Sequence, residues 1–180
     1  MITKFDDFKN DDLKMLYPEF NTDIVSDEFW KMVRIANWNA VIKGYKNNPI
    51  INKAHRDFFK QAQNRIYSKY SYNDIRKFGK ECHHMEAKLH EYFEDIWLDE
   101  KYGDIMPSDD GYDDLISSVV GKGKNFVKKI LETPKIFLQM AKDDDYVESF
   151  HYLFIIDEEE YHEIKSEFDP IYKNSRKYNL

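Results

Sequence analysis

An apolar seam between residues 75 and 96 constrains the fold of this chain more than any other feature of its sequence. Apolar residues recur there at alternating steps of three and four, namely Ile75, Phe78, Cys82, Met85, Leu89, Tyr92 and Ile96. This spacing is a heptad repeat, in which one face of a helix is buried against neighbouring helices. Ser71 and Asp74 stand just before it at the spacing of a capping box. The sequence therefore predicts a long helix over residues 72–98.

Helical spacing on both sides of the seam predicts further helices around it. Ser26 is the predicted N-cap of a helix that runs to about Val41, followed by a loop over 43–49 and a helix over 51–67. Beyond the seam, the sequence predicts helices over 108–120, 125–131, 134–140 and 147–154, and an acidic helix after Asp157. Only residues 154–156 are β-prone, and the glycines at 121 and 123 predict a break.

Strand signals are otherwise sparse, so the expected fold is all-α, a single-domain irregular multi-helix bundle with one long central helix. The helical domain is expected over residues 26–180. Residues 1–25 show no clean period and are expected to form an N-terminal arm or a short helix.

Charge and composition narrow the class of partner. The chain has 27 Lys and Arg against 34 Asp and Glu, and its net charge of -7 repels phosphate backbones. One cysteine cannot form an internal disulfide, and no stretch approaches the roughly 20 apolar residues that cross a bilayer. The first residues lack the apolar region of a secretion signal. We expect a cytoplasmic protein without direct nucleic-acid or membrane binding; its oligomeric state stays open.

Three polar residues on the predicted long helix are candidate metal ligands. His83, Glu86 and His90 are spaced by three and four, which places an imidazole, a carboxylate and an imidazole on one helix face, where zinc or iron could bind. Each also lies one residue beyond the seam, where solvated polar residues flank a packed face. A solvated helix edge is the first expectation, and a divalent metal site is the alternative. Cys82 belongs to the seam, so we expect it to be buried and inert.

Acidic clusters next to tyrosines are candidate partner-binding residues. An acidic face steers the approach of a basic partner, and tyrosines anchor interfaces. Helix-start charge and solvation explain the same acidic residues without a partner, and both interpretations stay open. The candidates are Asp109, Asp110, Tyr112, Asp113, Asp144, Tyr146, Glu159 and Tyr161.

Several motifs give a resemblance to a known family. They are Asp-Glu-Phe-Trp at 27–30, Ser-Asp-Asp-Gly-Tyr-Asp-Asp-Leu at 108–115, Gly-Lys-Asn-Phe at 123–126 and Leu-Glu-Thr-Pro at 131–134. Over roughly residues 29–154 the chain resembles the bacterial family catalogued as domain of unknown function 4240. The resemblance implies a helical domain and supplies no activity or catalytic residue. Within the second motif, Ser108 is expected to cap a helix and Gly111 to allow the close approach of another backbone or ring.

These observations favour a non-catalytic, protein-binding domain. No complete catalytic set is present in the sequence, and the acidic, tyrosine-rich segments suit a basic protein partner. The specific role we expect is that of an immunity protein that neutralises a basic toxin domain. The alternative is a metal-binding protein or a metal-dependent hydrolase that uses His83, Glu86 and His90.

Overall fold

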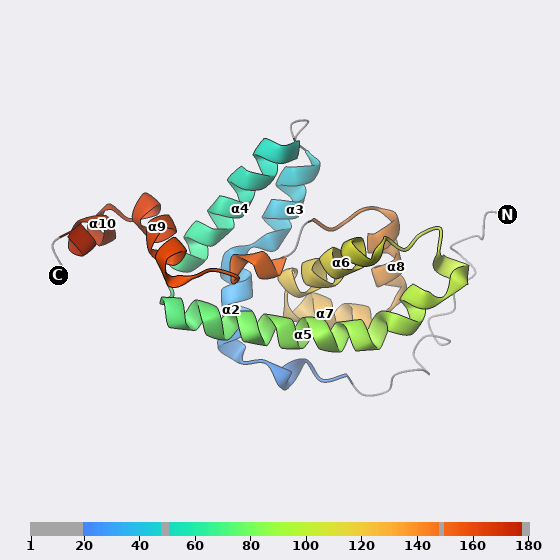
Figure 1. Cartoon of the computed structure of the whole chain (residues 1–180). Coiled ribbons are helices and arrows are strands. Elements are labelled where there is room, and N and C mark those ends of the chain that lie inside the picture. Colours follow the sequence, from blue (N-terminus) through green and yellow to red (C-terminus); the bar gives the residue numbers. More distant parts are fainter. Residues whose placement is uncertain (1–19, 48–50, 148–149, 178–180) are drawn as a thin grey trace.

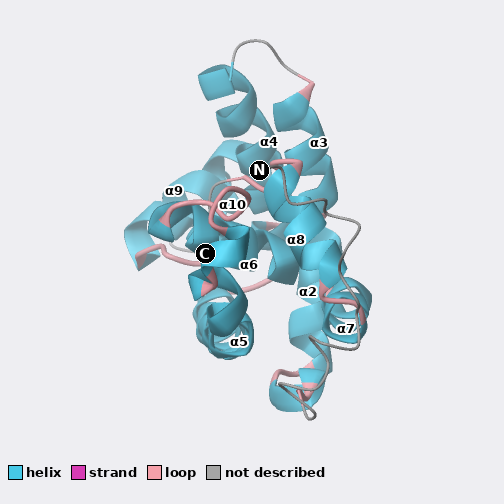
Figure 2. Ribbon diagram, turned by 90° about the vertical axis from the view of Figure 1, so that its right-hand side faces the viewer, coloured by secondary structure: helices cyan, strands magenta, loops and turns pink. Residues whose placement is uncertain are grey.

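The computed structural model describes residues 20–47, 51–147 and 150–177, and every regular element in these ranges is a helix (Figures 1 and 2). The α-helices are α2 (Asp27–Ala36), α3 (Trp38–Lys46), α4 (Ile51–Tyr67), α5 (Tyr72–Leu98), α6 (Asp109–Gly121), α7 (Lys124–Glu132), α8 (Lys135–Lys142), α9 (Glu158–Phe168) and α10 (Pro170–Lys177). The 3-10 helices are η2 (Thr22–Ile24), η3 (Glu100–Tyr102) and η4 (Phe150–Leu153). The predicted all-α bundle is confirmed.

The longest helix, α5, has the bounds that the seam predicts. The capping box forms: the Asp74 N–H donates to Ser71 Oγ at 3.3 Å, and the Asp74 carboxylate accepts the Ser71 backbone N–H at 3.0 Å. All seven seam residues are at most 6% exposed. Burial of one large apolar side chain contributes about 1.5–3 kcal/mol, so this stripe is the main support of the helix. Figure 1 shows α5 extending across most of the width of the molecule.

The predicted single helix from Ser26 to Val41 is wrong. It is divided into α2 and α3 by Asn37, whose left-handed backbone (φ 54°, ψ 55°) turns the chain. The Arg65 guanidinium of α4 donates two hydrogen bonds, of 3.1 and 2.6 Å, to the Ala36 carbonyl at the end of α2. The turn also places Trp38 in the core, where it is fully buried. The loop predicted over 43–49 begins later than expected, because α3 continues to Lys46; residues 48–50 lie outside the described ranges.

Glycines separate α6 from α7, as predicted. A Cβ on Gly121 would lie 2.6 Å from Trp38 Cδ1, so only glycine fits this contact. Gly123, with a φ of 98°, is the N-cap residue just before α7. The buried Ser118 hydroxyl accepts the Trp38 indole N–H at 3.4 Å and donates to the Val147 carbonyl at 3.1 Å. These contacts join α6, α3 and the segment before η4 into one core.

The C-terminal part of the chain matches the expected pattern only in part. The predicted helix over 147–154 is wrong, since η4 alone forms there, and residues 154–156 form no strand. Asp157 caps the predicted acidic helix, α9, by accepting the Glu160 N–H at 2.8 Å. Pro170 begins α10, as proline does at first helical positions.

Two further expectations concern the N-terminal arm and membrane-spanning helices. Most of the expected N-terminal arm, residues 1–19, lies outside the described ranges; η2 occupies part of the rest. Within the described part of the chain, no helix combines the length and apolar character needed to span a membrane.

Candidate functional site

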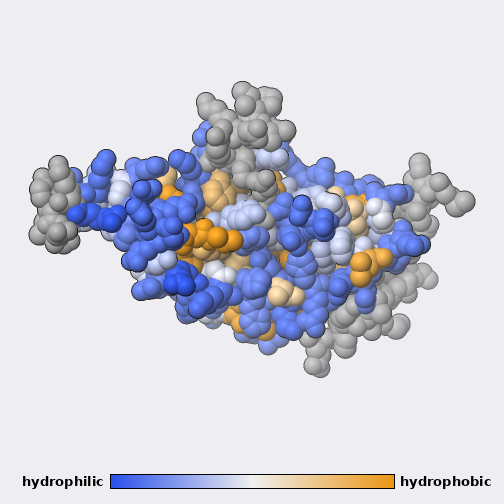
Figure 3. All heavy atoms as spheres, in the orientation of Figure 1, coloured by the Kyte–Doolittle hydropathy of each residue, from blue (hydrophilic) through white to orange (hydrophobic). Residues whose placement is uncertain are grey.

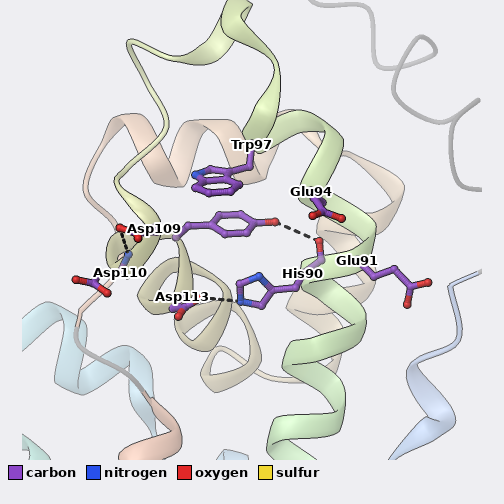
Figure 4. A pocket seen from close by; sticks show the side chains of 8 residues that line it. His90, Glu91, Glu94, Trp97, Asp109, Asp110 and Asp113 are labelled. Carbon is purple, nitrogen blue, oxygen red and sulfur yellow. Dashed lines mark hydrogen bonds and ion pairs between the residues drawn. The ribbon is translucent and has the colours of Figure 1, made fainter.

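Two hollows open along α5. The acidic pocket, of about 410 Å³, lies between the C-terminal part of α5 and the start of α6; its lining residues are His90, Glu91, Glu94, Trp97, Asp109, Asp110, Tyr112 and Asp113 (Figure 4). The basic groove, of about 490 Å³, lies between the N-terminal half of α5 and the chain around η4; its lining residues are Arg76, Gly79, Lys80, His83, Glu86, His151, Phe154, Ile155 and Ile156.

Two stacked aromatic rings form the inner wall of the acidic pocket. The rings of Trp97 and Tyr112 lie nearly parallel, 4.9 Å apart with an interplanar angle of 11°. The Trp97 indole N–H donates to the Pro107 carbonyl at 3.2 Å, and the Tyr112 hydroxyl donates to the His90 carbonyl at 3.3 Å. Both rings are therefore held in place by α5, α6 and the loop between them.

Five carboxylates belong to the described lining of this pocket: Glu91, Glu94, Asp109, Asp110 and Asp113. Two of them have a basic neighbour, since Asp113 Oδ1 lies 2.9 Å from His90 Nε2 and Glu91 Oε2 lies 2.6 Å from Lys88 Nζ. Glu94, Asp109 and Asp110 form no ion pair with any residue in the described ranges. The pocket thus keeps an excess of negative charge beside an aromatic surface.

The Ser108 motif positions the α6 side of this pocket. The Ser108 hydroxyl accepts the Gly111 N–H at 3.4 Å, which confirms the predicted cap. A Cβ on Gly111 would lie 2.7 Å from Pro107 Cβ and 3.5 Å from the Tyr146 hydroxyl, so the expected close approach is present. The glycine lets α6 start directly against the chain that leaves α5.

The predicted partner-binding residues fall into separate groups. Asp109, Asp110, Tyr112 and Asp113 line the acidic pocket, and Tyr146 borders it beside Gly111. Asp144 has a left-handed backbone (φ 48°) and lies close to Tyr146. The pKa of Tyr146 is raised, mainly by burial and further by the Asp144 and Asp114 carboxylates.

The prediction that Glu159 and Tyr161 share this surface is wrong. Both belong to α9, which packs on α4, away from the acidic pocket (Figure 1). Tyr161 is only 3% exposed, and its hydroxyl donates to the Tyr70 carbonyl at 2.7 Å. The acidic composition of the segment did not reveal that its tyrosine is a core residue.

The three predicted metal ligands do not converge. His90 faces Asp113 in the acidic pocket, whereas His83 and Glu86 line the basic groove. His83 and His90 are seven residues apart, which is about 10 Å along a helix that rises 1.5 Å per residue. In the described part of the chain, no three His, Cys, Asp or Glu side chains are grouped so that they could hold a metal ion. The helix-face spacing therefore does not create the predicted site.

Glu86 also departs from the expected solvated helix edge. It is only 7% exposed, and its Oε1 atom has no hydrogen-bond partner among the described residues. His151 Nδ1 lies 3.5 Å from this atom, a distance at which an ion pair forms without a good hydrogen bond. The Glu86 carboxylate raises the pKa of His151, against an opposing effect of burial. Cys82 is fully buried as predicted; burial and the Glu86 carboxylate raise the pKa of its thiol.

Ser117, His151 and Glu86 are a set of residue types known from catalytic triads, but their geometry differs from one. Ser117 Oγ and Glu86 Oε1 both lie 3.5 Å from the same ring nitrogen, Nδ1 of His151. A triad needs the base to bridge the serine and the acid through its two different nitrogens. Ser117 is fully buried and accepts the backbone N–H of His151 at 3.1 Å, so it fastens η4 to α6.

The sequence-based interpretation missed Trp97, Glu91 and Glu94. A usable signal was present, because His90, Glu94 and Trp97 are spaced by four and three and so share one face of α5. No family model, curated protein or solved structure matches the chain. The resemblance to domain of unknown function 4240 stays a prediction.

Proposed function

We propose that this chain is a protein-binding domain that holds a basic segment of its partner in the acidic pocket. The observation that carries the proposal is the meeting of carboxylates from two helices at one aromatic-walled hollow (Figure 4). Asp109 and Asp110 are favoured by the positive start of α6. Glu91 and Glu94 have no such reason, because they stand toward the negative end of α5.

This arrangement costs the isolated domain stability. Like charges that face one hollow repel one another, and the last turn of α5 contains no basic residue to offset them. A cation bound in the pocket relieves that repulsion. Glu91 has a local partner in Lys88, whereas Glu94, on the exposed side of α5, forms no ion pair with a described residue, so we ascribe the presence of Glu94 to a ligand.

Lysine or arginine is the ligand that matches both parts of the pocket. Carboxylates bind the guanidinium group of arginine with paired, charge-assisted hydrogen bonds. The Trp97 ring offers an aromatic face, and a cation over such a face gains about 0.5–2 kcal/mol. The long-range negative field of the domain also accelerates the encounter with a basic partner.

The biological role we propose is neutralisation of a basic toxin domain, which would make the chain an immunity protein. Its support is the net charge of -7 together with an acidic pocket suited to basic side chains. Co-expression with a basic toxin encoded beside this chain should restore growth and yield a complex on gel filtration. Full lethality without a complex would refute the immunity role and leave the binding function standing.

The binding function is tested with a short arginine-rich peptide titrated against the purified domain. Replacement of Glu94 and Asp110 by Gln and Asn should weaken binding about tenfold, or about 1.4 kcal/mol. The matched control neutralises Glu159 and Glu163, two exposed residues of α9, and should change the affinity less than twofold. Equal losses in both double variants would show attraction by net charge alone and contradict a site at the acidic pocket.

A further inference from the structure

The basic groove differs from the rest of this acidic protein in its charge. Its α5 wall carries Arg76, Lys80 and His83, all exposed. None of the three forms an ion pair with a residue in the described ranges, whereas Lys46, Lys122 and Lys124 all do. Arg76 instead lies over the Tyr72 ring, 5.9 Å from its centre. The groove thus presents unneutralised positive charge on a chain whose net charge is -7.

Among the described residues, one carboxylate lines the groove, and it already has a neighbouring partner. Glu86 is more than nine-tenths buried, and its Oε1 atom faces His151 Nδ1 at 3.5 Å. When His151 is protonated, its imidazolium neutralises this carboxylate across that distance. Arg76 and Lys80 therefore determine the charge that a ligand meets at the mouth of the groove.

The opposite wall is apolar and stands unusually close to α5. A Cβ on Gly79 would lie 3.0 Å from Phe154 Cβ, so the glycine allows the chain after η4 to approach the helix backbone. Ile155, next to Phe154, is 65% exposed. Figure 3 shows an apolar patch on this face, between α9 and α5.

We propose that the basic groove binds a small organic carboxylate with an apolar body, such as a medium-chain fatty acid. The carboxylate is held by Arg76 and Lys80, with His83 beside them, and the apolar body covers Phe154, Ile155 and Ile156. An inorganic anion would leave the isoleucines in water, and a neutral apolar molecule would leave the cations unpaired. A volume of about 490 Å³ is typical of sites for small molecules rather than for proteins.

Decanoate, below its micelle concentration, is the probe. Calorimetry should detect saturable binding of decanoate and none of decyltrimethylammonium, which has the same apolar body and the opposite charge. Replacement of Arg76 and Lys80 by glutamine should weaken decanoate binding about tenfold or more. The matched control replaces Lys69 and Lys77, two exposed lysines outside the lining, and should change it less than twofold.

The apolar wall needs its own variant. Ile155→Ser should weaken decanoate binding several-fold without loss of folding, because this side chain is already exposed. The proposal is overturned if decyltrimethylammonium binds as tightly as decanoate, if neither glutamine nor serine variants weaken binding, or if an acidic apolar peptide binds here and decanoate does not. This site is independent of the acidic pocket, so neither outcome bears on the proposed protein-binding function.

Discussion

The two hollows along α5 are built on one stripe of one helix and have opposite charge. Residues 76, 83, 90 and 97 recur every seventh position, directly beside the seam, so they share one face of α5. In the N-terminal half this face supplies Arg76 and His83 to the basic groove; farther along, His90 and Trp97 line the acidic pocket. The stripe itself contains no acidic residue, so the negative charge of the acidic pocket comes from Glu91 and Glu94 beside it and from the start of α6. The net charge of -7 averages over this reversal.

The partners of the stripe explain why each charge persists. At the acidic pocket, the start of α6 brings further carboxylates toward α5. At the basic groove, the facing chain is apolar, and Glu86 of α5, the one carboxylate among the described lining residues, is buried beside His151. The character of each hollow therefore depends on what the second element contributes, and the seam supports both.

The largest effect is expected from the core that both hollows share. Phe93 is fully buried and stacks on Phe137 of α8 at 4.1 Å. Phe93→Ala should lower the free energy of unfolding by about 3–5 kcal/mol, because it leaves a cavity in the core. Urea denaturation measures it, with the exposed Ala87→Ser as the control. A loss below about 1 kcal/mol would contradict the role of the seam side of α5 as the common support.

Much of this support could be predicted from the sequence. The heptad spacing and the Ser71 capping box give both ends of α5, since the seam can be read from the spacing of its residues and the cap is a contact within one helix. The division at Asn37 could not be predicted, because the left-handed turn is fixed by tertiary contacts such as that of Arg65 with Ala36. The short η4 in place of a helix likewise follows from its attachment to Ser117 of α6.

The candidate site was predicted in part. The Ser108 motif led to the α6 half of the acidic pocket, because cap and charge are local. The α5 half was missed, and Tyr161 was misplaced, since the burial of a tyrosine depends on which helix packs over it. A metal site at His83, Glu86 and His90 was the alternative to a solvated helix edge, and the rise of the helix between these residues argues against it.

A substitution at Trp97 distinguishes most clearly between binding at the two hollows. Trp97→Leu removes the aromatic face from the acidic pocket. It should weaken binding of the arginine-rich peptide about tenfold, or by about 1.4 kcal/mol. Decanoate affinity should stay unchanged, because Trp97 does not line the basic groove. Circular dichroism checks that the variant is folded. An equal loss for both ligands would mean that the two hollows are not distinct.

His151, which lines the basic groove, should make the stability of the fold depend on pH. Its pKa is raised above the ordinary 6.5 by the Glu86 carboxylate, so the ion pair stabilises the fold fully below that value and less as pH rises through the raised pKa. The free energy of unfolding of the wild type should exceed that of His151→Gln by on the order of 1 kcal/mol at pH 5.5, and this difference should disappear by pH 9. Urea denaturation at several pH values measures the difference; one that stays constant with pH would contradict the pairing.

The smallest effect is expected at α9. Tyr161→Phe removes the 2.7 Å hydrogen bond to the Tyr70 carbonyl and should cost about 0.5–1 kcal/mol of stability. It should leave the affinity for the arginine-rich peptide unchanged, because Tyr161 is a core residue away from the acidic pocket. Thermal unfolding and a peptide titration test both parts. Weakened peptide binding with unchanged stability would return Tyr161 to the partner surface.

The central claim, that one helix carries two hollows selective for opposite charges, is tested most directly by NMR with both ligands on the same labelled protein. The arginine-rich peptide should shift the Trp97 indole N–H and the amide signals at the start of α6, and leave residues 154–156 unchanged. Decanoate should shift the amides of residues 154–156 and leave the Trp97 indole unchanged. Shifts of one common set of signals by both ligands would contradict the claim.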